Sequence, residues 1–294
     1  MNTHSDAFAT YRPLLFSIAY RMLGSVMEAE DVVQEAYLRF LTTPIGEIRS
    51  AKALLTTIVT RLSLDQLKAA RTKREEYIGP WLPEPLATDE SPAEVADKHE
   101  MISMAFMVLL ENLAPAERAV FLLREVFDYD YTEIAQVVGK SESNCRQLYH
   151  RAKQYLTARR PRFQATHSAQ QQLLQRFVHA VGAGELEELT TLLADDVMLW
   201  SDGGGKATAA RRPIAGRDAV AKFLVGLNRM RTAETHSTIA EINGAPAILI
   251  YEGDLLIVVM TFVNDGEKIY ELRNVLNPDK LSHLRWRGAE PQST

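Results

Sequence analysis

The sequence contains one cysteine, Cys145, so no intrachain disulfide can form. So few thiols are typical of proteins in a reducing compartment, and we expect a cytoplasmic location. The first residues, MNTHSDAFATYRP, lack the basic start and apolar core of a secretory signal. Long apolar runs are also missing, because Glu252 and Asp254 interrupt the most apolar stretch, AILIYEGDLLIVVMTFV. That stretch predicts a β-hairpin, and we expect no membrane span.

Excess positive charge is missing as well, since the net charge is −5 at pH 7. The charge is nevertheless unevenly distributed. Residues 140–162 carry seven basic side chains and one acid, whereas residues 84–100 carry six acids and one lysine. The local field matters more than the total when a polyanion approaches, so the composition does not exclude nucleic-acid binding.

The chain has 294 residues, a length that predicts two or three domains. Helical spacing of apolar residues extends over 7–75 and resumes over about 97–160. Between them, four prolines within 77–97 exclude a long helix and predict a linker. Beyond residue 168 the pattern becomes mixed. We expect helices over 171–181, 184–195 and 216–230, a strand over 197–200, a Gly-rich loop over 201–206, and strands over 236–242, 246–252, 255–264 and 267–277. The sequence therefore predicts a multidomain fold, with two all-α domains followed by an α+β domain.

Residues 131–153 predict a helix-turn-helix. The segment YTEIAQVV forms a short helix, Gly139 and Lys140 supply the turn, and Ser141 is placed to N-cap a second helix. Cys145, at the inward spacing on that helix, is expected to pack rather than to act as a redox switch. The outward positions carry groups suited to base edges and phosphates: Ser143, Asn144, Arg146, Gln147, His150, Arg151 and Lys153. On the pattern alone, a solvated basic helix remains the alternative.

Two charged segments lie nearer the N-terminus. One short helix is crowded with Glu28, Glu30, Asp31, Gln34 and Glu35. Like charges three and four residues apart repel, and a basic partner would relieve that repulsion, although a solvated acidic face is the simpler alternative. The end of the next helix is basic, with Arg61, Lys68, Arg71, Lys73 and Arg74. Such groups can hold phosphates.

These motifs resemble a known family. LAPAERAVFLLREVFDYDYTEIAQVVGKSESNCRQLYHRAKQYL resembles the fourth conserved region of bacterial sigma factors, which binds the upstream promoter element. GSVMEAEDVVQEAYLRFL and ALLTTIVTRLSLDQLKAARTKRE resemble the second region. With only these two regions, the chain resembles an extracytoplasmic-function sigma factor. The resemblance implies that residues 28–35 bind the clamp helices of core RNA polymerase, and that residues 61–74 and 141–153 contact promoter DNA.

The tail narrows the resemblance. YIGPWLPEP, DGGGK at 202–206 and NPDKL at 277–281 are similar to a SigJ-type subgroup in which a SnoaL-like domain, a cone-shaped α+β fold, follows the sigma regions. The predicted boundaries are 1–76 for region 2, 77–96 for a Pro-rich acidic linker, 97–163 for region 4 and 168–290 for the SnoaL-like domain. The resemblance implies an interdomain, regulatory set: Trp81, Leu82, Trp200, Asp202, Gly203, Gly204, Gly205, Lys206, Asn277, Pro278, Asp279 and Lys280. We expect Trp81 and Leu82 to pack against the C-terminal domain.

Three roles for the C-terminal domain remain to be compared. As an enzyme it could use Asp202, or an acid–base group among His179, Asp195 and Asp196, but no spacing demands chemistry. DGGGK lacks the full phosphate-loop pattern, so its glycines more plausibly allow close backbone approach or positive φ. The favoured role is a regulator acting in cis, with no cofactor and no metal, in which a small-molecule ligand would act only by binding two states differently. The third is a repressor whose C-terminal domain binds or converts a small molecule, but a repressor does not need the acidic helix.

Overall fold

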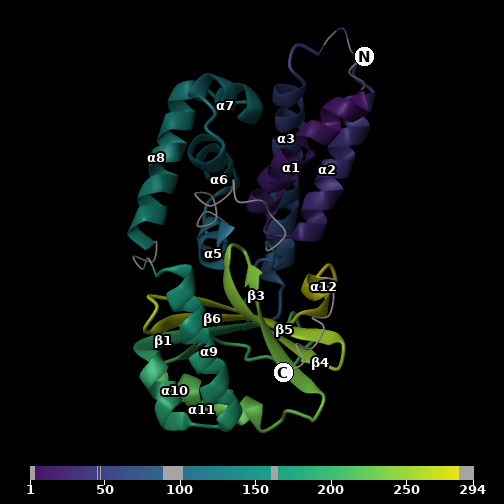
Figure 1. Cartoon of the computed structure of the whole chain (residues 1–294). Coiled ribbons are helices and arrows are strands. Elements are labelled where there is room, and N and C mark those ends of the chain that lie inside the picture. Colours follow the sequence, from purple (N-terminus) through teal and green to yellow (C-terminus); the bar gives the residue numbers. More distant parts are fainter. Residues whose placement is uncertain (1–3, 45, 47, 89–101, 160–164, 285–294) are drawn as a thin grey trace. The chain divides into compact units, whose positions relative to one another are not determined.

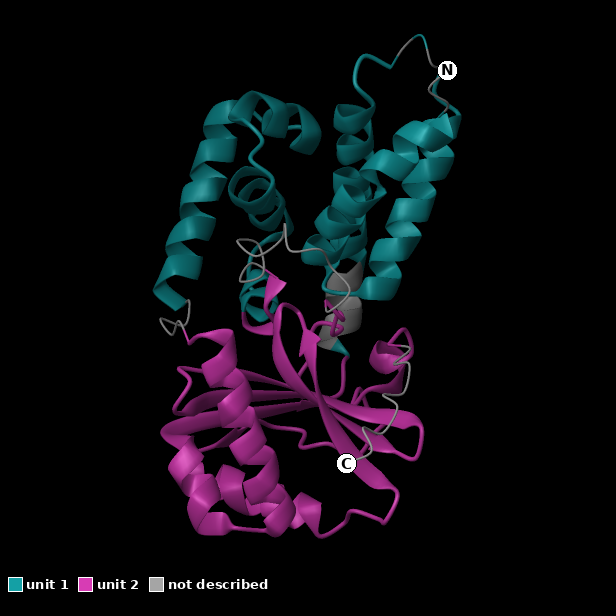
Figure 2. Cartoon of the chain, in the orientation of Figure 1, with its two compact units in different colours: residues 1–76, 106–160 teal, residues 77–105, 161–294 magenta. Residues whose placement is uncertain are grey.

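The chain divides into two units, Met1–Glu76 with Phe106–Arg160, and Tyr77–Ala105 with Pro161–Thr294 (Figure 2). The computed structural model describes residues 4–44, 46, 48–88, 102–159 and 165–284, and it leaves the side chains of 70–75 undescribed. The first unit contains both predicted helical regions. The described residues 77–88, within the predicted linker, cluster with the C-terminal domain instead of forming a free spacer.

The N-terminal part of the first unit is a bundle of three helices (Figure 1). Ser25 begins the second helix as its N-cap, because its hydroxyl accepts a hydrogen bond from the backbone N–H of Glu28 at 3.1 Å. Apolar residues at helical spacing, among them Leu15, Val33 and Leu55, are fully or almost fully buried between the helices. The helices are α1 (His4–Leu23), α2 (Val26–Leu41) and α3 (Ala51–Glu75).

The second helical part contains the predicted helix-turn-helix. Asp130 and Glu133 form a capping box at the start of α7, and Gly139 ends that helix with a φ of 66°. Ser141 accepts a hydrogen bond from Asn144 N–H at 3.3 Å, which confirms the predicted N-cap. Cys145 is fully buried beside Ile134. The elements are α5 (Met104–Glu111), α6 (Pro115–Phe121), a π-helical turn η4 (Leu122–Val126), α7 (Tyr131–Val138) and α8 (Glu142–Arg159).

The two helical parts pack on each other within the first unit. The buried hydroxyls of Thr56 on α3 and Tyr129 lie 2.9 Å apart and share a hydrogen bond. Arg118 on α6 is almost fully buried, and it donates to the backbone carbonyl of Met22 at 2.6 Å and to Glu111 at 2.8 Å. Burial lowers the pKa of Arg118 to about 9. Polar contacts inside the interface therefore fix how the two parts fit together.

The C-terminal domain is a six-stranded sheet of order β2-β1-β6-β5-β4-β3, with helices on one face (Figure 1). All neighbouring strands are antiparallel except β1 and β6, which run parallel. The predicted hairpin is confirmed as β4 and β5. The elements are α9 (His167–Ala183), α10 (Leu186–Leu192), β1 (Leu193–Asp202), β2 (Ile214–Ala215), α11 (Arg217–Asn228), β3 (Thr235–Ile242), β4 (Ala245–Glu252), β5 (Leu255–Asn264), β6 (Ile269–Val275) and α12 (Pro278–Leu281).

One predicted boundary is wrong. The helix expected over 184–195 ends at Leu192, and the strand expected from Val197 already begins at Leu193. The reason is tertiary pairing, since Leu193 pairs with Ile269 of β6 and is fully buried. Sheet pairing there overrides the helical pattern of the local sequence.

Candidate functional site

The parallel pairing of β1 and β6 brings two of the sequence motifs together. Asp202 is the last residue of β1 and pairs with Val275, the last residue of β6. The chain then turns so that the backbone N–H groups of Leu276 and Asn277 both donate to the carbonyl of Asp202, at 2.8 and 2.9 Å. Asn277 also N-caps the short helix α12 through its side chain. The segment NPDK is thereby held beside DGGGK.

Asp202 is the centre of a buried hydrogen-bonded cluster. Its Oδ2 atom lies 2.8 Å from Lys280 Nζ and accepts the backbone N–H of Leu82 at 2.8 Å. Its Oδ1 atom accepts the hydroxyl hydrogen of Tyr77, whose oxygen in turn accepts from Asn277 Nδ2 at 2.9 Å. Lys280 also donates to the carbonyl of Leu82. We call these five residues, Tyr77, Leu82, Asp202, Asn277 and Lys280, the linker latch.

The chemistry of the latch makes the attachment specific. The side chains of Asp202 and Lys280 are 0% and 7% exposed, so the two opposite charges compensate each other away from water. The ammonium also lies 4.0 Å from the ring centroid of Trp81 and 5.0 Å from that of Tyr77. Burial, followed by the hydrogen bond to Asp202, raises the pKa of Tyr77 and keeps it a donor. These contacts confirm the predicted packing of Trp81 and Leu82.

The glycines of DGGGK allow the linker to approach closely. A Cβ atom on Gly204 would lie 2.3 Å from Asn277 Nδ2 and 2.7 Å from the Tyr77 hydroxyl, and Gly204 also has a φ of 57°. A Cβ atom on Gly205 would lie 2.9 Å from Ile78 Cδ1. The interpretation of these glycines as residues of close approach and positive φ is therefore confirmed.

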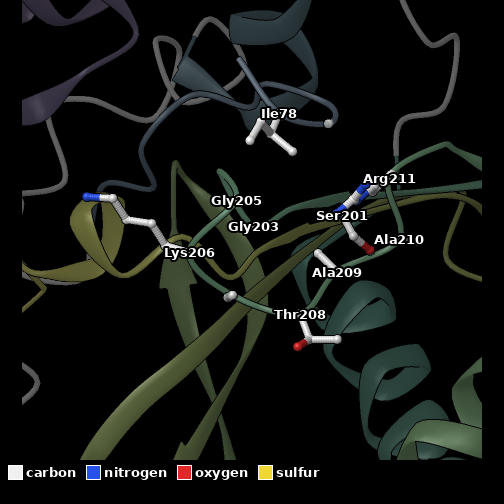
Figure 3. A pocket seen from close by; sticks show the side chains of 11 residues that line it. Ile78, Ser201, Gly203, Gly205, Lys206, Thr208, Ala209, Ala210 and Arg211 are labelled. Carbon is white, nitrogen blue, oxygen red and sulfur yellow. The ribbon is translucent and has the colours of Figure 1, made fainter. Parts of the chain in front are cut away.

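Figure 3 shows Ile78 of the linker facing the Gly-rich loop across a cavity of about 350 Å³. Gly203, at the start of this loop, has no room for a side chain, because a Cβ atom there would lie 2.5 Å from the carbonyl oxygen of Ala207. The side chain of Lys206 leaves the loop to form an ion pair with Asp279 of α12 (Figure 3). Lys206 and Asp279, the two charged residues of DGGGK and NPDK that are not part of the latch, therefore pair with each other.

The linker is also attached farther along. Asn243, in the turn between β3 and β4, donates its backbone N–H to Leu86 O at 2.7 Å and accepts from Leu86 N–H at 3.0 Å. Its Nδ2 atom donates to the carbonyl of Ile102 at 2.9 Å. Asn243 is fully buried with a φ of 54°. Asn-Gly pairs favour tight turns between strands, but no sequence pattern indicated that this turn binds the linker.

A second cavity, of about 280 Å³, lies between α9, α11 and the sheet. Its walls are mainly apolar, and Glu252 lies among its lining residues. Hydrogen bonds from the hydroxyls of Thr232 and Thr235 lower the pKa of Glu252 and keep it ionised. The acid–base candidates of the sequence, Asp202, His179, Asp195 and Asp196, are not among the residues that line this cavity. Within the described residues, no cluster of His, Cys, Asp and Glu is arranged to hold a metal.

The outward face of α8 is presented as the sequence predicts. All seven predicted DNA-contacting residues on it, from Ser143 to Lys153, are exposed. Two of them are held by acids, because Arg146 lies 3.1 Å from Glu142 and Lys153 lies 3.2 Å from Glu125. The structure thus gives α8 a polar, basic face over an apolar one.

The basic end of α3 behaves differently. Arg61 donates to the backbone carbonyls of Gln136 and Val137 of α7, at 2.9 and 3.0 Å. Lys68 is exposed and pairs with Asp65 at 2.9 Å. The side chains of Arg71, Lys73 and Arg74 lie outside the described residues. Only part of this predicted surface can therefore be located.

The acidic positions of α2 are half-buried or exposed. Glu30 pairs with Arg12 and Glu35 with Arg39, each at 2.7 Å, whereas Asp31 and Gln34 are exposed. Glu28 lies in the first turn, where a negative charge is favoured by the helix dipole. The same helix exposes three apolar side chains that the charge pattern did not single out, Met27, Leu38 and Leu41.

Comparisons with known proteins match all three parts of the chain. The model described as Sigma-70 region 2 matches residues 7–73, that of Sigma-70, region 4 matches residues 103–156, and that of the SnoaL-like domain matches residues 174–276. The chain is 37% identical to the ECF RNA polymerase sigma factor SigJ of Mycobacterium tuberculosis, over 97% of this chain and 96% of the relative. It is 30% identical to the probable ECF RNA polymerase sigma factor SigI of that species, over 96% of each chain.

Comparison of the folds also finds SigJ. The crystal structure of the Mycobacterium tuberculosis extracytoplasmic function sigma factor SigJ superimposes with a TM-score of 0.75, at 34% identity, covering 94% of this chain and 97% of that one. No helix in the described part of the chain combines the length and apolar character that a membrane span requires.

Proposed function

This chain belongs to the extracytoplasmic-function (ECF) RNA polymerase sigma factors, and we propose that its C-terminal domain regulates initiation in cis through the linker latch. The family membership makes the chain a factor for promoter-specific transcription initiation, not an enzyme. Its two helical regions bind core RNA polymerase and promoter DNA. What the C-terminal domain adds is the subject of the proposal.

Within the helical unit, α2 contacts the polymerase clamp helices, and α8 with the end of α3 contacts the promoter. The acidic groups of α2 and its exposed Met27, Leu38 and Leu41 form a surface with charge to steer a basic partner and apolar area to bind it. The exposed Asn144, Gln147 and Arg151 of α8 are suited to base edges and phosphates.

We infer that the described packing of the two sigma regions differs from the one that binds a promoter. Arg61, expected to contact DNA, donates instead to two carbonyls of the helix-turn-helix, and Thr56 is bonded to Tyr129. Regions that contact the upstream and downstream promoter elements must separate to reach both. We infer that this packing is a closed form of the two sigma regions and that activity requires it to open.

The latch limits that opening through the connecting chain. Region 2 ends with α3 at Glu75, and Tyr77, two residues later, is bound to Asp202. Region 4 begins with α5 at Met104, and Ile102, two residues earlier, is bound to Asn243. Both sigma regions are thus attached to one domain almost at their ends. Released and extended, residues 76–103 would span about 90 Å, at roughly 3.3 Å per residue.

In vitro transcription with core RNA polymerase tests the proposal, on a promoter that the protein selects from a random template pool. Asp202→Asn removes the carboxylate that binds Lys280, the Tyr77 hydroxyl and the Leu82 amide, and it is expected to release the linker and raise promoter output several-fold. Asp195→Asn removes the same charge from the same strand, but Asp195 is 84% exposed, so output should not change. Unchanged or lowered output from a folded Asp202→Asn protein would refute regulation through the latch.

A second role for the same domain is the binding of a small molecule. The observation that favours it is the apolar cavity beneath α9 and α11. Binding is favoured over conversion, because none of the sequence-predicted acid–base residues lines that cavity. The two roles are compatible if occupancy of the cavity changes the latch.

A further inference from the structure

We propose that the apolar cavity of the C-terminal domain takes an uncharged, mainly apolar small molecule, and that its occupancy tightens the linker latch. This inference rests on the proposed regulation in cis, and it assigns to that regulation a ligand class and a direction. The two observations that carry it are the chemistry of the cavity walls and the identity of two residues in those walls.

The cavity walls specify the class of ligand. Phe177, Leu224, Ile250 and Met260 supply apolar surface from two helices and two strands. The volume of about 280 Å³ is close to the lower limit of ligand pockets, roughly 300–1,000 Å³. Such a space fits a compact molecule of up to about three rings or a short branched chain, and its apolar surface favours hydrophobic binding.

The charged residues of the cavity favour an uncharged ligand. Glu252 is ionised, and Arg231 lies among the same lining residues with its guanidinium 3.4 Å from the carbonyl of Thr235. The two charges are opposite, so neither an anion nor a cation gains a net attraction. A single hydrogen-bond donor on the ligand would find an acceptor in Glu252.

Two wall residues connect the cavity to the latch. Leu276 lines the cavity, and its backbone N–H donates to the carbonyl of Asp202 at 2.8 Å. The next residue, Asn277, bonds the hydroxyl of Tyr77. Thr208, two residues after the Gly-rich loop, lines both the apolar cavity and the cavity beside Ile78, so it is a wall that the ligand space shares with the cavity next to the linker. The segments that hold the linker are therefore also walls of the cavity.

The effect of the ligand on the latch follows from the state of the latch in which the cavity is formed. The walls formed by Leu276 and Thr208 are in place while the latch is closed, so a molecule that fits binds the closed latch preferentially. A ligand that prefers one state stabilises it, and the state in turn raises the affinity for the ligand by the same factor. Ligand should therefore slow release of the linker, and loss of the latch should weaken ligand binding equally.

Binding can be tested with N-phenyl-1-naphthylamine, an uncharged aromatic amine with one N–H donor whose fluorescence rises in apolar surroundings. The full-length protein should give saturable binding. Ile250→Trp and Ser237→Trp each place bulk in the cavity from a half-buried strand position and should abolish it. Leu255→Trp adds the same bulk at an exposed position outside the cavity and should bind the probe normally. No saturable binding, or binding that survives both filled variants, would overturn the site.

The coupling needs a second measurement, amide hydrogen exchange of the peptide covering residues 77–88. The probe should slow exchange of the Leu82 amide at least about fivefold, the lower limit of typical allosteric coupling. Lys280→Met should weaken probe affinity by the factor by which the probe slows exchange. Saturable binding with unchanged exchange and unchanged affinity in Lys280→Met would overturn the coupling. That result would leave the proposed regulation intact, since the transcription assay of Asp202→Asn uses no ligand.

Discussion

The ammonium of Lys280 lies 2.8 Å from the carboxylate of Asp202, although 78 positions separate the two residues, and both side chains are buried. The pair exists because parallel strands β1 and β6 end side by side, which places a strand terminus next to the short helix that follows the other strand. Both charged groups also form hydrogen bonds to the linker. Asp202 accepts from Tyr77 and Leu82, and Lys280 donates to Leu82. The same two side chains therefore form the buried ion pair and bind the linker.

This relationship predicts non-additive mutations. Asp202→Asn and Lys280→Met should each destabilise the C-terminal domain by about 3–5 kcal/mol, because each breaks a buried ion pair by removing one member. The double variant should recover part of that loss, because the partner left behind by each single variant is then removed as well. Thermal unfolding of the four proteins gives the coupling energy. Strictly additive losses would show that the charges do not depend on each other.

The Gly-rich loop predicts a steric effect that a matched glycine can isolate. Gly204→Ala would place a methyl group against Asn277 and the Tyr77 hydroxyl, at a φ of 57°. Gly184→Ala, at a φ of 71°, carries the same backbone strain with nothing within 4 Å. Hydrogen exchange at residues 77–88 should accelerate only in the first variant, while both lose some stability. Equal acceleration in the two would assign the effect to strain and not to contact with the linker.

The sequence predicts the parts of this protein that are encoded locally. Ser141 could be predicted as a helix start, because a cap requires only one residue and the turn that follows it. The outward face of α8 follows from helical spacing alone. In contrast, the start of β1 at Leu193 depends on pairing with Ile269, a partner that local spacing does not reveal.

The candidate site shows the same limit more strongly. Family resemblance selected four of the five latch residues and missed Tyr77. The side-chain contacts of the latch join positions 78 to 200 apart, so no spacing rule could pair Tyr77 with Asp202 and Asn277. Arg61 was predicted as a DNA contact from its charge, yet its hydrogen bonds to α7 depend on how two regions pack. The apolar cavity arises from two helices and three strands together and has no signature in any of them.

The closed packing of the sigma regions predicts a variant that opens them without touching the DNA-contacting residues. Thr56→Val removes one partner of a buried hydrogen bond and leaves the Tyr129 hydroxyl unsatisfied, at a cost of about 1–3 kcal/mol. Tyr129→Phe in addition removes the orphaned group and should restore part of the packing. Small-angle scattering should show an increased radius of gyration for Thr56→Val alone. A radius identical to that of the parent protein would place the restraint elsewhere.

Tyr251 predicts how the C-terminal domain responds to alkaline pH. Its hydroxyl is buried with no hydrogen-bond partner among the described residues, and burial raises its pKa from the ordinary 10 to about 12. The unfolded chain therefore releases this proton first, so stability is complete below pH 10 and is lost as the pH rises from 10 to 12. Tyr251→Phe should flatten this loss and raise stability at neutral pH by about 1 kcal/mol.

The comparison for Tyr251 is Tyr270, whose hydroxyl donates to Asp265 at 2.8 Å. Tyr270→Phe removes a satisfied hydrogen bond and should lower the melting temperature at neutral pH, where Tyr251→Phe raises it. Melting curves between pH 7 and 12 give both results. If Tyr251→Phe melts at a lower temperature than the parent protein at pH 7, the Tyr251 hydroxyl of the parent protein forms a hydrogen bond. The predicted loss of stability between pH 10 and 12 would then be wrong as well.

Arg151 on the exposed face of α8 predicts a change in the salt dependence of DNA binding. Each phosphate contact contributes about 0.9 to the slope of log affinity against log salt, because it releases condensed counterions. Arg151→Ala should therefore weaken promoter binding and reduce that slope by about one. Arg176→Ala removes the same charge from α9, where it pairs with Glu188, and should alter neither quantity. If Arg151→Ala reduces the affinity but leaves the slope unchanged, Arg151 contacts a base edge or supports the helix. If the affinity is also unchanged, this face of α8 does not contact the DNA.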